Sequence, residues 1–144
     1  MKEIKLKPIG FAKSAVKQAR HGGFAGVVSE IVLDKKYSRA LDGIAGYSHV
    51  IVVYWMHRVK GVELKHRPQG NPRVPVVGIF ACRCTQRPNP IAITTVRLLG
   101  RKGSRLKVKG LDVLDGTPVL DIKPYWPQYD AAANARIPAW VDEL

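Results

Sequence analysis

Proline and glycine interrupt this chain so often that a bundle of long helices has no room to form. The sequence holds 10 Pro and 13 Gly in 144 residues, and both residue types end helices and mark turns. Hydrophobic residues make up 46% of the chain and charged residues 24%, which is typical of a folded domain with a core rather than of a disordered chain. We therefore expect one turn-rich and strand-rich domain.

Short apolar runs between these turn residues predict the strands. Apolar and polar residues alternate at 4–8 and 104–109, and the run at 49–57 is so continuously apolar that it favours a central strand buried on both faces. A helical turn is expected near residues 37–41, and loops at 13–26, 60–75 and 81–90. Strands are expected at 4–8, 27–33, 49–57, 76–80, 91–99, 104–109 and 119–122. Without helix–strand alternation, this pattern indicates an all-β barrel or sandwich.

Positive charge is in large excess. Lys and Arg number 24 against 11 Asp and Glu, a net charge of +13, which attracts polyanions such as nucleic acid. Arg105, Lys107 and Lys109 alternate with apolar residues, so one face of that strand would be basic and could follow a phosphate backbone. The alternatives are that the charge serves solubility alone and that the row only protects a strand edge.

The sequence predicts a cytoplasmic protein without a metal site. The first residues contain no apolar run suited to a signal peptide, and no stretch is long enough for a membrane helix. Cys82 and Cys84 are too few for zinc and too close for a disulfide framework. In an extended segment their side chains would project to opposite sides.

The loop at 81–90 is the segment that packing explains least. Arg83, Arg87 and Asn89 stand there between rigid prolines and two expected strands, and guanidinium groups suit carboxylate or phosphate ligands. The alternative is an edge turn in which Asn89 bonds the backbone.

Two further positions could carry chemistry. His57 ends the long apolar run and is followed by Arg58; such a His could accept a proton, stack on a base, or be structural. The Asp115–Pro118 stretch has the composition of a tight turn, whose backbone could also approach a ligand closely. The sequence has no glycine-rich phosphate loop, nucleophile elbow or zinc motif, so these residues alone do not identify a reaction.

A resemblance to a known family covers residues 9–125. The chain resembles the TrmO family, also called TsaA-like or YaeB-like. The blocks that carry the resemblance are LDGI at 41–44, YSH at 47–49, YWMHR at 54–58, GIFACR at 78–83, RPNPI at 87–91, VRLLG at 96–100 and GLDVLDGTPVLDIKPY at 110–125.

The resemblance implies a fold and an activity. It implies a β-barrel domain over residues 1–127 with long loops and a short tail at 128–144, working as a homodimer. The implied activity is S-adenosylmethionine-dependent methylation of N6 of threonylcarbamoyladenosine, beside the tRNA anticodon. A barrel that binds RNA without catalysis, or one that only senses the cofactor, is the alternative.

The resemblance also assigns site residues. The implied cofactor contacts are His57, Arg58, Arg83, Ile93, Asp115, Gly116, Thr117 and Pro118. His57 is the first candidate for the base that removes a proton from the acceptor nitrogen, and Arg87 and Asn89 match motif positions assigned here to the RNA substrate. Cys84 stands where the family usually has Ser, and Ala92 where it usually has Gly.

Overall fold

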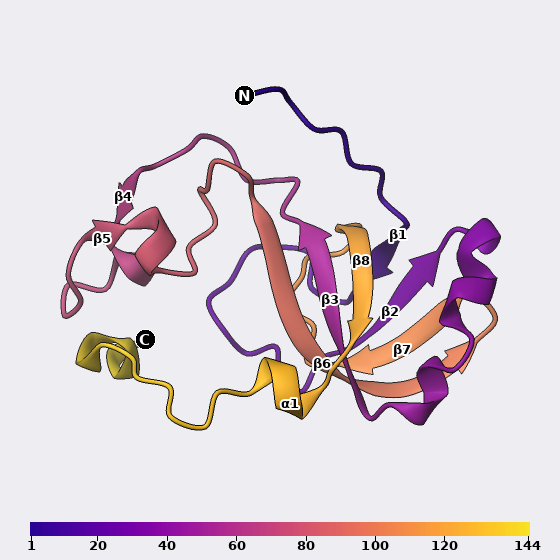
Figure 1. The fold of residues 1–144 in the computed structure, drawn as a ribbon. Helices are drawn as coiled ribbons and strands as arrows, with labels where there is room; N and C mark the ends of the chain where they lie inside the picture. The colour runs from indigo at the N-terminus through magenta and orange to yellow at the C-terminus, as the bar shows by residue number, and fades with distance from the viewer. The chain divides into compact units, whose positions relative to one another are not determined.

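The computed structural model describes all 144 residues, and strands dominate it (Figure 1). The chain forms two compact units, one made of Met1–His57 and Ala92–Tyr125 and the other of Arg58–Ile91 and Trp126–Leu144. None of the helices has the length and apolar character that a bilayer crossing requires.

The first unit is a closed barrel of six strands. Its strands are β1 (Gly10–Lys13), β2 (Val28–Leu33), β3 (His49–Trp55), β6 (Ile91–Lys102), β7 (Arg105–Lys109) and β8 (Pro118–Pro124). They follow one another around the barrel in the order β1-β2-β7-β6-β3-β8. The all-β barrel is thereby confirmed.

Alternate side chains of each strand fill the barrel. Ile31, Val50, Val52, Leu106 and Val108 are fully buried and belong to one apolar cluster. In β3 only every second residue is buried, so the expected burial on both faces is wrong. A strand of a closed barrel has one inner and one outer face, and the outer one tolerates apolar residues without requiring cover.

The expected first strand at residues 4–8 is also wrong. Ile4 and Leu6 are exposed, and the strand begins instead at Gly10, which pairs with Leu33 of β2 and Val119 of β8. A side chain at Gly10 would place its Cβ 2.2 Å from the carbonyl oxygen of Val32. The backbones therefore meet closely at a position that only glycine fits.

The β6–β7 hairpin is longer than the sequence suggested. β6 continues through Lys102, so the turn lies at Gly103 and Ser104 rather than at 100–103. The register of the pair shifts between Leu98 and Gly100. The helical turn after β2 is present as η1 (Lys35–Leu41), where the Asp34 side chain accepts a hydrogen bond from the backbone of Lys36, and η2 (Ile44–Gly46) follows.

The second unit contains little regular structure. β4 (Lys65–His66) pairs with β5 (Val77–Gly78), and the helical turns are η3 (Pro68–Gly70), η4 (Ile79–Ala81), α1 (Pro127–Asp130) and η5 (Ala139–Glu143). The buried strand expected at 76–80 is wrong, because Val76 and Phe80 are exposed and the chain turns into η4. The side-chain amide of Asn71 donates to the backbone carbonyl of Glu143 at 2.9 Å, and Arg73 forms an ion pair with the Glu143 carboxylate at 3.1 Å. The domain boundary at residue 127 stays a prediction.

Candidate functional site

Three strand ends of the barrel meet around the hydroxyl of Tyr54. This hydroxyl donates to the carbonyl oxygen of Asp112 at 2.7 Å and lies 2.9 Å from the hydroxyl of Thr94 in β6. Tyr54 is also paired with Val119 of β8. The end of β3, the start of β6 and the turn before β8 therefore lie at one end of the barrel.

Most of the predicted cofactor residues of the first unit lie at this end. His57 follows β3, Ile93 belongs to the start of β6, and the Asp115–Pro118 stretch precedes and begins β8. The structure thus brings together residues that are far apart in sequence. Tyr54 was missed in the sequence, where it is only one more large residue in an apolar run.

Asp115 uses both carboxylate oxygens to hold the loop that follows β1. One oxygen accepts the backbone N–H of Ser14 at 2.9 Å, and the other accepts the ammonium of Lys17 at 2.6 Å. The hydrogen bond from Lys17 and then that from Ser14 lower the pKa of Asp115. Nothing in the sequence marked Ser14 or Lys17, because both stand in an irregular loop.

Backbone bonds to β1 complete the turn. The backbone N–H of Gly116 donates to the carbonyl oxygen of Ala12 at 2.8 Å, and the N–H of Ala12 donates to the carbonyl oxygen of Thr117 at 2.8 Å. The buried hydroxyl of Thr117 donates a hydrogen bond to the carbonyl oxygen of Leu114 at 2.7 Å. Gly116 is exposed, and no atom lies within 4 Å of where its Cβ would be. A flat ligand can therefore approach the backbone there.

An aromatic pair marks the end of β3. The rings of Trp55 and His57 pack edge to face with centroids 6.0 Å apart, and the N–H of His57 donates to the carbonyl of Trp55 at 2.8 Å. Trp55 and Ile93 are exposed, and His57 is half-buried. This end of the barrel therefore offers apolar surface and an imidazole ring.

In the second unit, Arg87 organises the loop that the sequence singled out. One of its terminal nitrogens, Nη1, donates to the carbonyl oxygens of Ile79, Cys82 and Cys84, at 3.0, 2.8 and 3.1 Å. Its guanidinium also lies 5.8 Å from the centroid of the Phe80 ring. Because one guanidinium group binds three backbone carbonyls, it fixes the shape of the loop. The side chains of Arg58, Arg83 and Asn89 are exposed.

The two cysteines lie together rather than on opposite sides. The segment is not extended, because η4 bends the chain just before Cys82. Burial and the neighbouring Cys82 thiol, with which it shares a hydrogen bond, raise the pKa of Cys84 to about 12. Cys84 therefore carries almost no thiolate at neutral pH.

The predicted basic row lies on the outside of the barrel. Arg105, Lys107 and Lys109 are exposed on β7, while Leu106 and Val108 point inward. The alternation expected for this strand is confirmed.

Comparisons with known proteins place this geometry in context. Residues 12–131 match the family model described as the tRNA-methyltransferase O N-terminal domain. An S-adenosyl-L-methionine-binding protein of Archaeoglobus fulgidus is 42% identical over 129 residues, which cover 87% of this chain and 91% of that protein.

Two other relatives are longer than this chain. The crystal structure of TrmO from Pseudomonas aeruginosa matches with a TM-score of 0.78 and 34% identity, covering 96% of this chain and 63% of that one. A tRNA (adenine(37)-N6)-methyltransferase of Mus musculus is 36% identical over 100 residues, which cover 68% of this chain and 23% of that protein.

Proposed function

From the premise that this chain belongs to the tRNA-methyltransferase O N-terminal domain family, we propose that it is an S-adenosylmethionine-dependent tRNA methyltransferase. Its acceptor is N6 of threonylcarbamoyladenosine beside the anticodon, and it works as a homodimer. The observation that carries the proposal is the convergence of three strand ends around Tyr54. That convergence gathers residues from separate motifs at one end of the barrel.

The residues at this end suit the parts of the cofactor. The exposed backbone at Gly116 can approach an adenosine, and the exposed side chain of Ile93 offers apolar contact. Trp55, which is exposed, suits a sulfonium, because cations are attracted to aromatic rings. Asp115, Thr117 and Pro118 belong to the same proposed cofactor set, with Asp115 acting by shaping the turn. Arg58 and Arg83 of the second unit are proposed cofactor contacts on the family resemblance alone.

His57 is the residue proposed to take up the proton of the acceptor nitrogen. When bound, the cofactor supplies an electrophilic methyl group. The acceptor nitrogen must lose a proton, and a half-buried imidazole whose ring packs on Trp55 can take it up. The barrel end contributes orientation, because a near-attack geometry lowers the barrier without further chemistry.

The substrate base must leave the anticodon-loop stack to reach this end. Unstacking costs little in a single-stranded loop. Arg87 and Asn89 are the residues proposed to serve RNA binding. Arg87 keeps the shape of the loop through its hydrogen bonds, and exposed neighbours such as Asn89 contact the RNA.

The test combines calorimetry with mass spectrometry of tRNA nucleosides. The wild type is expected to bind S-adenosylmethionine and to add one methyl group to threonylcarbamoyladenosine in isolated tRNA. Arg83→Ala is expected to weaken cofactor binding. His57→Asn is expected to slow methyl transfer far more than it weakens cofactor binding. Lys123→Gln, a change on the outer face of β8, serves as the control.

Three outcomes would contradict the proposal. Absence of binding heat and of a thermal shift at millimolar cofactor overturns the methyltransferase. Binding without transfer to any nucleoside supports the cofactor-sensing alternative. Transfer to a different nucleoside leaves the enzyme class standing and overturns the acceptor.

A further inference from the structure

The outer face of four barrel strands carries a surplus of cations. The strand register places Lys13 beside Glu30 and Glu30 beside Lys107. It also places Arg105 beside Lys102, and Lys109 beside Arg97. Neighbouring strands are about 5 Å apart and alternate residues about 7 Å apart. Six cations therefore lie on this outer face, and Glu30 is the one carboxylate among the residues paired there.

Most of these cations are available to a ligand. Arg97, Lys102, Lys107 and Lys109 are exposed and form no ion pair in the structure, whereas Arg105 binds Glu30 at 3.1 Å. Arg101, the neighbouring cation of the hairpin, is instead half-buried and bound to Asp42 at 3.0 Å. The face thus has several positive charges without an acidic partner and one negative charge, that of Glu30.

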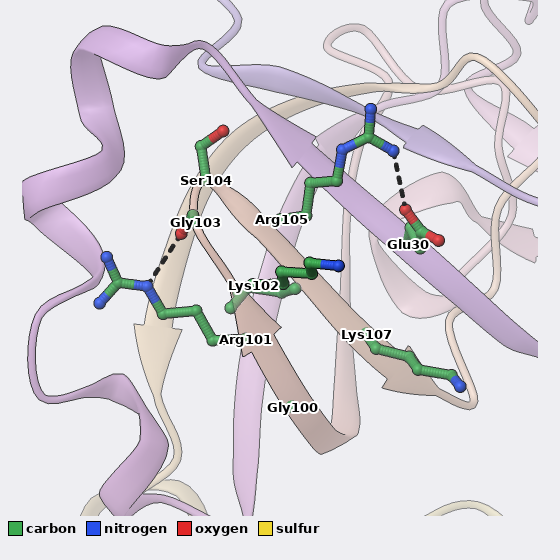
Figure 2. Close-up of a pocket in the computed structure, with 9 residues that line it drawn as sticks. Glu30, Gly100, Arg101, Lys102, Gly103, Ser104, Arg105 and Lys107 are labelled. Atoms are coloured by element: carbon green, nitrogen blue, oxygen red, sulfur yellow. Dashed lines mark hydrogen bonds and ion pairs between the residues drawn. The ribbon is translucent and has the colours of Figure 1, made fainter.

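A hollow opens over the β6–β7 hairpin at this face. It has a volume of about 670 Å³, and its lining includes Glu30, Gly100, Lys102, Arg105 and Lys107 (Figure 2). Gly100 pairs with Lys107 and contributes no side chain to the outer surface. The missing side chain leaves a notch with cationic residues around it.

We propose that the outer face of β1, β2, β7 and β6 binds RNA backbone, with one phosphate in the notch over Gly100 and Glu30 weakening the grip. The choice of RNA as the partner rests on the proposed function. A small anion would need an enclosed site, whereas these cations spread over four strands. Phe11, which is 47% exposed in β1 and pairs with Val32, adds an aromatic surface of the kind that stacks on bases.

Glu30 gives the proposal its sharpest consequence. Its carboxylate faces the same phosphate that Arg105 and Lys107 would attract, so it repels the RNA and also occupies Arg105. Removing this charge is expected to strengthen RNA binding, which no merely structural role would do.

The experiment measures tRNA affinity by fluorescence anisotropy, without cofactor, over a series of KCl concentrations. Glu30→Gln is expected to tighten binding by about two- to fivefold, the usual effect of one exposed charge. Gly100→Glu is expected to weaken it by about tenfold or more, because a carboxylate would stand in the phosphate notch. Lys107→Gln should lower the salt slope by about one unit.

Lys123→Gln is the matched control. It lowers the net charge by one, as Gly100→Glu does, but it lies on β8, which is outside the four strands of the proposed face and is separated from β6 and Gly100 by β3. Affinity should change less than about twofold in this variant, because one distant charge is largely screened. A new side chain at Gly100 meets no atom within 4 Å of its Cβ, so the fold should survive, as circular dichroism will show.

The outcomes separate this proposal from the proposed function. Equal losses in Gly100→Glu and Lys123→Gln, or no gain in Glu30→Gln, overturn the RNA face. If wild-type protein still methylates tRNA in that case, the enzymatic function stands and the RNA lies elsewhere. If the affinities shift as expected while no methylated nucleoside forms, the face stands and the methyltransferase falls.

Discussion

At the scale of single residues, Asp115 shows how a motif residue can act through its neighbours. Both of its carboxylate oxygens are engaged, by Ser14 and by Lys17, so its structural work is to join the loop after β1 to the turn before β8. Because the negative form is the one that accepts these bonds, the pKa of Asp115 lies below its ordinary value.

This lowered pKa predicts an acid-dependent loss of stability. The folded chain favours the carboxylate, so Asp115 contributes stability above the pKa of the unfolded chain, and the contribution is lost as pH falls through the lower folded pKa. Melting temperatures of wild type and Asp115→Asn should therefore differ at neutral pH, and the difference should shrink only as pH falls below the ordinary aspartate pKa of about 3.9. Lys17→Met should reduce the difference, and a gap that is constant with pH would contradict this reading.

At the scale of secondary-structure elements, close backbone contact fixes where β1 pairs. Gly10 lies against the backbone of Val32 and Leu33, and its strand joins β2 to β8. A methyl group there would push two strands apart at the point where the barrel closes.

Gly10→Ala is accordingly expected to destabilise the protein by about 2 kcal/mol or more, the usual cost of overpacking. Gly100→Ala is the comparison, because its Cβ meets open space and should leave stability nearly unchanged. Urea denaturation of the two variants measures both values. Equal midpoints would show that β1 adjusts without cost.

The sequence predicted best those elements whose pattern is local. β2, β7 and β8 were expected close to their observed positions because alternation or turn residues bound them. Residues 4–8 alternate equally well but pair with no strand, and 76–80 is apolar but half exposed. Local pattern cannot distinguish these cases, since a strand needs a partner.

The site was predictable as a set of motifs but not as a geometry. The residues near His57 and Asp115 carried the family resemblance, whereas the contacts of Tyr54 with Asp112 and Thr94 depend on the closure of the barrel. The network of Arg87 was likewise hidden, because its acceptors are backbone carbonyls, which leave no trace in the choice of side chain.

At the scale of the whole molecule, cations far outnumber the acidic residues that could pair with them. With 24 basic and 11 acidic residues, at least 13 cations lack an acidic partner of their own. The ion pairs lie at the surface, where each contributes about 0–1 kcal/mol.

Screening should therefore stabilise the free protein. Raising KCl weakens the repulsion among exposed like charges, and the melting temperature is expected to rise with salt until the repulsion is screened. A scan with an uncharged osmolyte of matched osmolality serves as the control. A melting temperature that falls with KCl would mean that the few ion pairs dominate.

The neighbouring positions of β3 and β6 have a consequence for how such proteins diversify. These strands are adjacent in the barrel, yet residues 56–90 lie between them along the chain. The intervening stretch is thus a long insertion between two neighbouring strands. Insertions or deletions within it leave the pairing of both strands intact. The length and sequence of this insertion, which carries the arginine-containing loop at 81–90, can therefore change in evolution while the barrel is kept.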